Sequence, residues 1–131
     1  MNFNAISRDQ LKKLHQLDNI AIMLDEAIRD GSIMSEEIES AQSIVDKMVS
    51  VLIDRDNTLG SHVYIIYEIQ ALLQWIKGNR FAAFDFVRTA RAIKGSDDLL
   101  SVNARRMLDV IYLEEQLAQP TNSRKKILGR F

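Results

Sequence analysis

The chain has 131 residues, a length at which one ordinary hydrophobic core can stabilise a single domain. Its hydrophobic fraction of 47%, charged fraction of 27% and formal net charge of −1 exclude a disordered chain, which would combine low hydrophobicity with high net charge. Because cysteine is absent, a disulfide framework, a thiolate metal site and a cysteine nucleophile are excluded as well.

The nearly neutral net charge hides a basic C-terminus. Arg124, Lys125, Lys126 and Arg130 lie within the last nine residues without an acidic neighbour, which leaves the remainder of the chain mildly acidic. An acidic body does not attract the phosphate backbone, whose binding depends on Lys and Arg contacts. Nucleic-acid binding is therefore expected only through this tail, whose simpler interpretation is a solubilising segment.

No membrane insertion or secretion is expected. The longest apolar-rich stretch, from Val63 to Ile76, is shorter than the roughly 20 residues of a membrane-spanning helix. The N-terminal residues lack both a continuous apolar region and a small-residue cleavage site. A cytoplasmic protein is the expectation.

The first predicted helix begins near Arg8 and ends at Gly31. Its cap is Ser7, and Gln10 follows three residues later in the spacing of a capping box. Its apolar residues recur at intervals of three and four, which is typical of a helix that packs lengthwise on another helix. This seam consists of Leu14, Leu17, Ala21, Leu24 and Ile28.

A second helix is predicted from Ser35, as its N-cap, with Glu36 and Glu37 at the positive end of the helix dipole. Its seam repeats the three-four spacing at Ile38, Ala41, Val45, Met48 and Leu52. Because the connection is short, residues 8–57 are expected to form a long antiparallel hairpin.

Three further helices follow. Residues 63–76 are apolar at nearly every position, apart from Glu68, Gln70 and Gln74, which is typical of a central buried helix. The next helix is predicted from Arg80 to Lys94, ending at Gly95, and the last from Leu99 to Ala118, with Ser96 as its cap and Asp97 and Asp98 in its first turn. The sequence thus predicts an all-α, five-helix bundle in a single domain, residues 1–120, followed by a flexible basic tail, residues 121–131.

Residues 64–97 resemble a single tetratricopeptide-repeat hairpin. Gly78 and Asn79 fall at the turn between its helices, and Ala71, Ala83 and Ala90 fall at positions where that family has small residues. The resemblance implies a concave helical surface that holds a peptide or a partner helix, as in adaptors and small secretion chaperones.

Catalytic and metal sites are not expected. His15 and His62 are the only histidines and have no metal-ligand spacing, and no nucleophile elbow, phosphate-binding loop or dinucleotide motif is present. Adjacent acidic pairs point in different directions around a helix. We therefore predict no enzyme, no catalytic residue, no metal and no cofactor.

Six aromatic residues are concentrated between residues 64 and 86. They are Tyr64, Tyr67, Trp75, Phe81, Phe84 and Phe86. In one interpretation they fill the core of the bundle. In the other they leave an apolar patch for a partner, since aromatic residues are enriched in the centres of interfaces.

The leading functional hypothesis is a protein-binding helical module, an adaptor or secretion-type chaperone, which occludes or positions a helical or extended partner. The alternative is a small regulatory protein of a nucleic-acid process that uses the basic tail. A homodimer is a further expectation, because Ile20, Ile44 and Val51 are apolar positions that the seams do not use.

Overall fold

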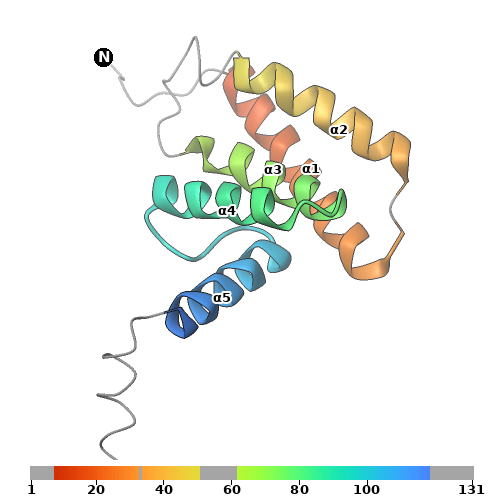
Figure 1. Cartoon of the computed structure of the whole chain (residues 1–131). Helices are drawn as coiled ribbons and strands as arrows, with labels where there is room; N and C mark the ends of the chain where they lie inside the picture. Colours follow the sequence, from red (N-terminus) through yellow and green to blue (C-terminus); the bar gives the residue numbers. More distant parts are fainter. Residues whose placement is uncertain (1–7, 33, 51–61, 119–131) are drawn as a thin grey trace, which may run out of the picture.

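The computed structural model describes residues 8–32, 34–50 and 62–118. These residues form five helices and no strand, which confirms the all-α class for the described part of the chain (Figure 1). The helices are α1 Arg8–Asp30, α2 Ser35–Met48, α3 Tyr64–Ile76, α4 Arg80–Lys94 and α5 Val102–Leu117. The predicted tail lies outside the described residues, as does the predicted continuation of the second helix from residue 51 to residue 57.

Two glycines end helices as the sequence predicts. Gly31 follows α1 with a φ of 69° and Gly95 follows α4 with a φ of 81°, a backbone conformation that glycine adopts without steric cost. The N–H of Gly95 donates to the carbonyl of Arg91 over 2.8 Å and closes the last turn of α4. The predicted start of α4 at Arg80 is also confirmed, whereas the predicted cap of α1, Ser7, lies outside the described residues.

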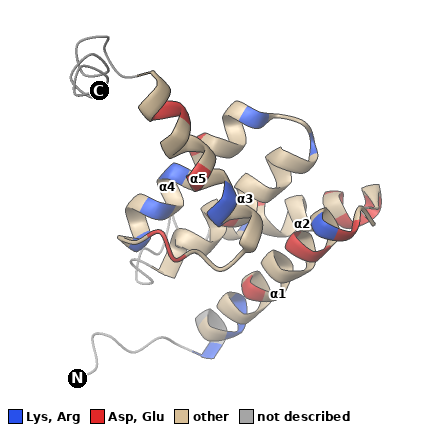
Figure 2. Cartoon of the chain, turned by 90° about the horizontal axis from the view of Figure 1, so that it is seen from below, with Lys and Arg blue, Asp and Glu red and all other residues tan. Residues whose placement is uncertain are grey.

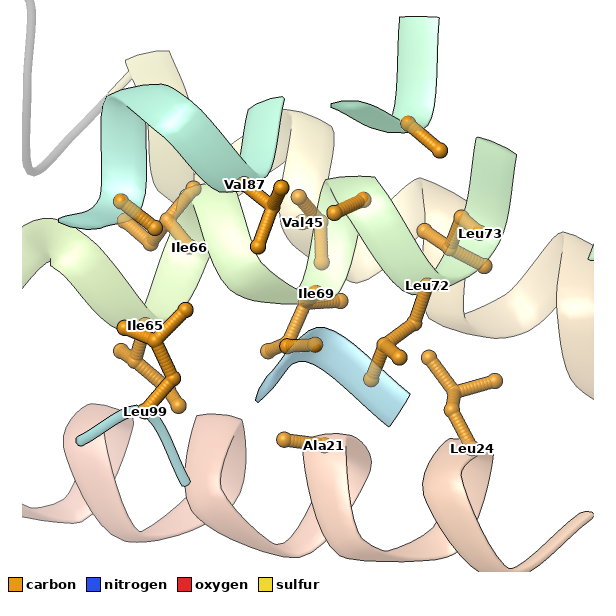
Figure 3. Close-up of a cluster of buried hydrophobic side chains, with 14 of the residues drawn as sticks. Ala21, Leu24, Val45, Ile65, Ile66, Ile69, Leu72, Leu73, Val87 and Leu99 are labelled. Atoms are coloured by element: carbon orange, nitrogen blue, oxygen red, sulfur yellow. The ribbon is translucent and has the colours of Figure 1, made fainter. Parts of the chain in front are cut away.

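Helix α3 lies at the centre of the core. Seven of its 13 residues are buried, as expected for a helix that is apolar on nearly every side. In Figure 3, Ile69 and Leu72 of α3 lie among side chains of other helices, including Ala21 and Leu24 of α1 and Val87 of α4. One cluster of buried side chains includes residues from all five helices, so each helix buries an apolar face in the same core.

Helix α1 packs mainly on α3 and much less on α2, which differs from the predicted pairing of the two seams. The burial of its seam is as predicted, since Leu17, Ala21 and Leu24 are buried and Leu14 and Ile28 are partly buried. The physical reason for the different partner is area. Helix α3 presents apolar side chains on more sides than α2, so packing α1 there removes more apolar surface from water.

Helix α2 contacts α3 and lies beside α1. Its predicted seam residues Ala41, Val45 and Met48 are buried. The predicted cap is wrong, because Ser35 is the first helical residue and Met34 occupies the cap position without a side-chain hydrogen bond.

The predicted start of the last helix is also wrong. Helix α5 begins at Val102, three residues after Leu99, and its cap is Ser101 instead of Ser96. The N–H of Ala104 donates to the Oγ of Ser101 over 2.9 Å. Leu99 is buried in the core, so the chain inserts this side chain before it begins the helix.

The position of Ile69 gives a test of this core. Replacing Ile69 with Ala should lower the free energy of unfolding by about 2–5 kcal/mol through lost burial and a cavity, and Ile69→Val should lower it by about 0.5–1.5 kcal/mol. Ile22 of α1 is 45% exposed, so Ile22→Ala should cost much less. Urea unfolding measures all three variants, and equal losses for Ile69→Ala and Ile22→Ala would contradict this packing.

Candidate functional site

Asp25 of α1 holds the first turn of α5. The N–H of Val102 donates to Asp25 Oδ2 over 2.9 Å and the N–H of Asn103 donates to Oδ1 over 3.0 Å. The side-chain amide of Asn103 also donates to Oδ1. Asp25 is only 6% exposed. A carboxylate here satisfies N–H groups that have no partner within the helix and is attracted by the positive end of the helix dipole.

Glu68 of α3 binds the residues just before this turn. It is fully buried and accepts hydrogen bonds from the N–H of Leu100, over 3.0 Å, and from the N–H of Ser101. Burial raises the pKa of Glu68 above its usual range, because desolvation disfavours the ionised form. The N–H groups of Ser101 and Leu100, the Ser101 hydroxyl and the charge of Lys94 act in the opposite direction.

These two carboxylates form a structural site and are poorly suited to acid-base catalysis. Each oxygen of Asp25 and of Glu68 already accepts a hydrogen bond from a backbone N–H. A general base must instead direct a lone pair at a proton of the substrate. Sequence reasoning noted Glu68 only as a polar residue in an apolar helix, and no local pattern identified Asp25.

Asp97 joins the loop before α5 to two helices. Its Oδ1 accepts hydrogen bonds from Arg91 Nε of α4 and from the Tyr112 hydroxyl of α5, both over 2.8 Å. Mainly the hydrogen bond from Arg91, and also that from Tyr112, hold the pKa of Asp97 below its usual range. The predicted role of Asp97 as a first-turn acid is therefore wrong, because this residue precedes the helix and fixes the loop.

Removing Asp25 should destabilise the fold. In the Asp25→Ala variant the N–H groups of Val102 and Asn103 lose their acceptor, which should lower the free energy of unfolding by about 1–3 kcal/mol. Glu26→Ala is the matched control, because Glu26 is an exposed carboxylate on the same helix. Its change should remain within about 0.5 kcal/mol. Urea unfolding followed by circular dichroism makes the comparison, and equal effects would show that the cap is unimportant.

The pKa of Glu68 predicts a pH dependence. Because the folded-state pKa is raised above 4.5, the folded protein binds this proton more tightly than the unfolded chain, and stability increases as the pH falls through the folded pKa. Gln cannot titrate. The wild type should therefore gain stability relative to Glu68→Gln as the pH falls from neutral towards 4.5, measured by urea unfolding. A relative loss of stability over this range would mean that the N–H donors outweigh desolvation.

The structure divides the six predicted aromatic residues. Three are partly buried against the core: Tyr64, Tyr67 and Phe86. Phe84 is buried, with 3% exposure, so the core interpretation holds for this residue. Trp75 is 38% exposed and Phe81 is 86% exposed, so these two remain available to a partner.

Trp75 and Phe81 lie where the chain turns from α3 into α4. The Trp75 ring stacks on Phe84 with a centroid distance of 6.2 Å and an interplanar angle of 20°. The Arg80 guanidinium carbon lies 5.1 Å from the centroid of the same Phe84 ring. Arg80 also forms an ion pair with Glu114 of α5 over 2.6 Å, which brings the last turns of α5 to this turn.

Two leucines flank Glu114 on α5 and are exposed, Leu113 by 56% and Leu117 by 62%. We refer to Trp75, Phe81, Leu113 and Leu117 as the aromatic end. Sequence reasoning identified the two aromatic residues and missed the two leucines. Glu114, which lies between them in the sequence, pairs with Arg80 at the start of α4. These two residues are 34 positions apart, so no local pattern predicts the pair.

A groove follows the line between α1 and α2. It consists of two adjoining hollows of about 300 and 260 Å³ that share Ile44. Its apolar lining consists of Ile20, Met23, Ala41, Ile44 and Met48. The sequence hypothesis of a homodimer named Ile20 and Ile44 of this set, and its third residue, Val51, lies outside the described residues.

The larger hollow beside α2 is polar. It has a volume of about 390 Å³ and lies between α2 and Lys77, the residue after α3. Lys77 Nζ donates to Gln42 Oε1 over 2.8 Å, and Glu39 and Asp46 also line this hollow. Because this hollow is wide and lined by both acidic and basic side chains, its charges do not indicate one class of ligand.

Three predictions remain, which concern the basic tail, metal binding and membrane insertion. Arg124, Lys125, Lys126 and Arg130 lie outside the described residues, so the tail hypothesis stays a prediction. Within the described residues, no group of three or more His, Asp or Glu side chains is arranged to hold a metal ion. None of the five described helices combines the length and the apolar character that a membrane crossing needs.

Comparison of the chain with protein-family models, with curated proteins and with solved structures found no match. The resemblance of residues 64–97 to a tetratricopeptide hairpin therefore stays a hypothesis.

Proposed function

We propose that this protein is a protein-binding helical module that acts by occluding or positioning a partner and not by catalysis. The observation that supports this proposal is Phe81, which is 86% exposed on the first turn of α4. A large apolar ring in this position contributes little to the core and keeps nearly all of its surface for contact with another molecule.

The surroundings of Phe81 favour a binding surface. Single exposed apolar side chains are common, but here Trp75 is exposed in the same α3–α4 segment, and Leu113 and Leu117 are exposed on the turns of α5 that carry Glu114, the ion-pair partner of Arg80. Stacking on the buried Phe84 holds the Trp75 ring in place. Because the Trp75 side chain is already held, it loses little conformational entropy when a partner binds, so more of the contact energy contributes to affinity.

The proposed partner is a helix or an extended peptide with apolar side chains. An adaptor or a secretion-type chaperone would use such a surface. The packing of α3 against α4 supports a repeat-like hairpin. Ala71 of α3 and Ala83 and Ala90 of α4 are fully buried and belong to the same core cluster. Small residues at such positions allow helix backbones to approach closely.

The alternative, a regulator of a nucleic-acid process, depends on the basic tail. Figure 2 shows Lys and Arg beside Asp and Glu on α1 and α2. Helix α4 has four basic residues and one acidic residue, but its three arginines each form an ion pair with an Asp or Glu, which reduces the positive charge available for phosphate groups. Strongly salt-dependent binding of the full chain to nucleic acid would favour this alternative.

Two phenylalanines of α4 test the proposed function. Phe81→Ala should leave the free energy of unfolding within about 0.5 kcal/mol of the wild type, because the ring is exposed. It should weaken partner binding by about 1–3 kcal/mol, as at interface hot spots. Phe84→Ala should instead cost about 3–5 kcal/mol of stability.

The partner is sought by capture from a native-cell extract on immobilised full-length protein, followed by mass spectrometry. A specific partner should be retained by the wild type and by Leu11→Ala but lost by Phe81→Ala. Leu11 is a suitable control, since it is 46% exposed and lies on the first turns of α1, away from the α3–α4 turn (Figure 1). Equal retention by Phe81→Ala would show that the aromatic end is not the binding surface. A captured partner that binds the purified protein should also shift the Trp75 emission to shorter wavelength as water leaves the ring.

A further inference from the structure

The groove between α1 and α2 is a second apolar surface, formed by helices that contribute no residue to the aromatic end. Its floor consists of nearly buried side chains, of which Ile20 is 9% exposed and Met48 is 7% exposed. Above this floor, Met23 is 36% exposed and Ile44 is partly exposed. The groove therefore offers apolar contact area along the outer side of a helix pair.

Opposite charges lie at the two ends of the groove. Glu36 and Glu37 line one hollow and Lys13 and Lys47 line the other. Glu37 and Lys47 are ten residues apart on α2, a separation of about 15 Å along the helix axis. The ion pairs that the structure contains within the described residues, Arg80–Glu114, Arg88–Asp85, Arg88–Glu115 and Arg91–Asp97, involve none of these four side chains.

We propose that a second copy of this chain occupies the groove, with the two α1–α2 pairs packed face to face around a two-fold axis. In such an isologous contact each copy presents the same surface in reversed direction. The acidic end of one groove therefore meets the basic end of the other, and two sets of opposite charges are matched by one symmetry operation.

The register of α2 agrees with this arrangement. If Glu37 lies opposite Lys47 of the other copy, then Ser40 lies opposite Ile44, because both pairs are centred on position 42. Ser40 lines the groove and is small, so it leaves space for the larger Ile44 side chain. The contact then resembles a four-helix bundle, in which side chains from facing helices fill the centre.

Charge order is the reason to prefer a second copy over an unrelated ligand. A basic peptide would match only the Glu36–Glu37 end, and an acidic peptide only the Lys13–Lys47 end. The apolar face is short, since the 14 residues of α2 span about 21 Å, so the dimer should be weak, with a dissociation constant on the order of tens of micromolar.

Sedimentation of the full-length chain at low salt tests the proposal, because screening at high salt weakens charge selection. The wild type should dimerise over a range from a few to several hundred micromolar. Glu37→Lys and Lys47→Glu should each weaken association about tenfold or more, since each places like charges opposite one another at two symmetric points. An equimolar mixture of the two variants should associate at concentrations where neither associates alone. In the mixed dimer the introduced lysine faces the introduced glutamate, and the native Lys47 of one copy faces the native Glu37 of the other.

Glu39→Lys is the matched control, because Glu39 lies on the same helix and lines the polar hollow but does not line the groove, whereas Lys47 lines both. It should dimerise like the wild type, and circular dichroism should show that every variant is folded. A wild type that stays monomeric at several hundred micromolar would overturn the proposal, as would a mixture that fails to associate. A dimer that Phe81→Ala dissociates and the charge variants do not would also overturn it, by placing the contact at the aromatic end. The proposal is independent of the proposed partner binding, since Phe81→Ala leaves the groove intact.

Discussion

The N–H groups at the start of α5 cannot find acceptors within their own helix, and the fold places them where water has little access. The carboxylates of Asp25 and Glu68 accept hydrogen bonds from them and come from α1 and α3, respectively. The hydrophobic effect is non-directional, whereas hydrogen bonds require specific distances and angles. The four directional hydrogen bonds tie the first, third and fifth helices at one point.

Helix α3 provides both kinds of interaction. Its apolar side chains pack on α1, α2, α4 and α5. Its buried carboxylate, Glu68, accepts a hydrogen bond from the N–H of Leu100, just before α5. A buried charge is costly unless its oxygens are hydrogen-bonded, so the position of Glu68 and the path of residues 95–101 depend on each other. Leu99, inserted in the core beside this carboxylate, gives the loop an apolar anchor as well.

Local patterns predicted much of the fold and little of the polar contacts. The helices from Arg8 and Arg80 follow from periodicity and from glycine ends, which depend on neighbouring residues only. The start of α5 did not follow, because Asp97 and Asp98 look like first-turn acids until the Arg91 partner of Asp97 is known. Local signals are insufficient wherever the decisive partner is distant in the sequence.

The candidate surfaces show the same limit. The sequence identified an aromatic cluster but not the difference between Phe81 and Phe84, which are three residues apart on the same helix. Phe84 is covered by the Trp75 ring and the Arg80 guanidinium, neither of which a local pattern assigns to it. The sequence identified Ile44 as a spare apolar position. It did not identify the groove that Ile44 lines, because the groove forms only where α1 lies beside α2.

The hydrogen bond between Asp25 and Val102 joins residues 77 positions apart and has a consequence for biosynthesis. A ribosome releases the chain from its N-terminus, so both acceptors, Asp25 and Glu68, emerge well before the donors at the start of α5. Until residues 100–103 have been synthesised, these two carboxylates have none of the four backbone N–H donors that they bind in the complete fold.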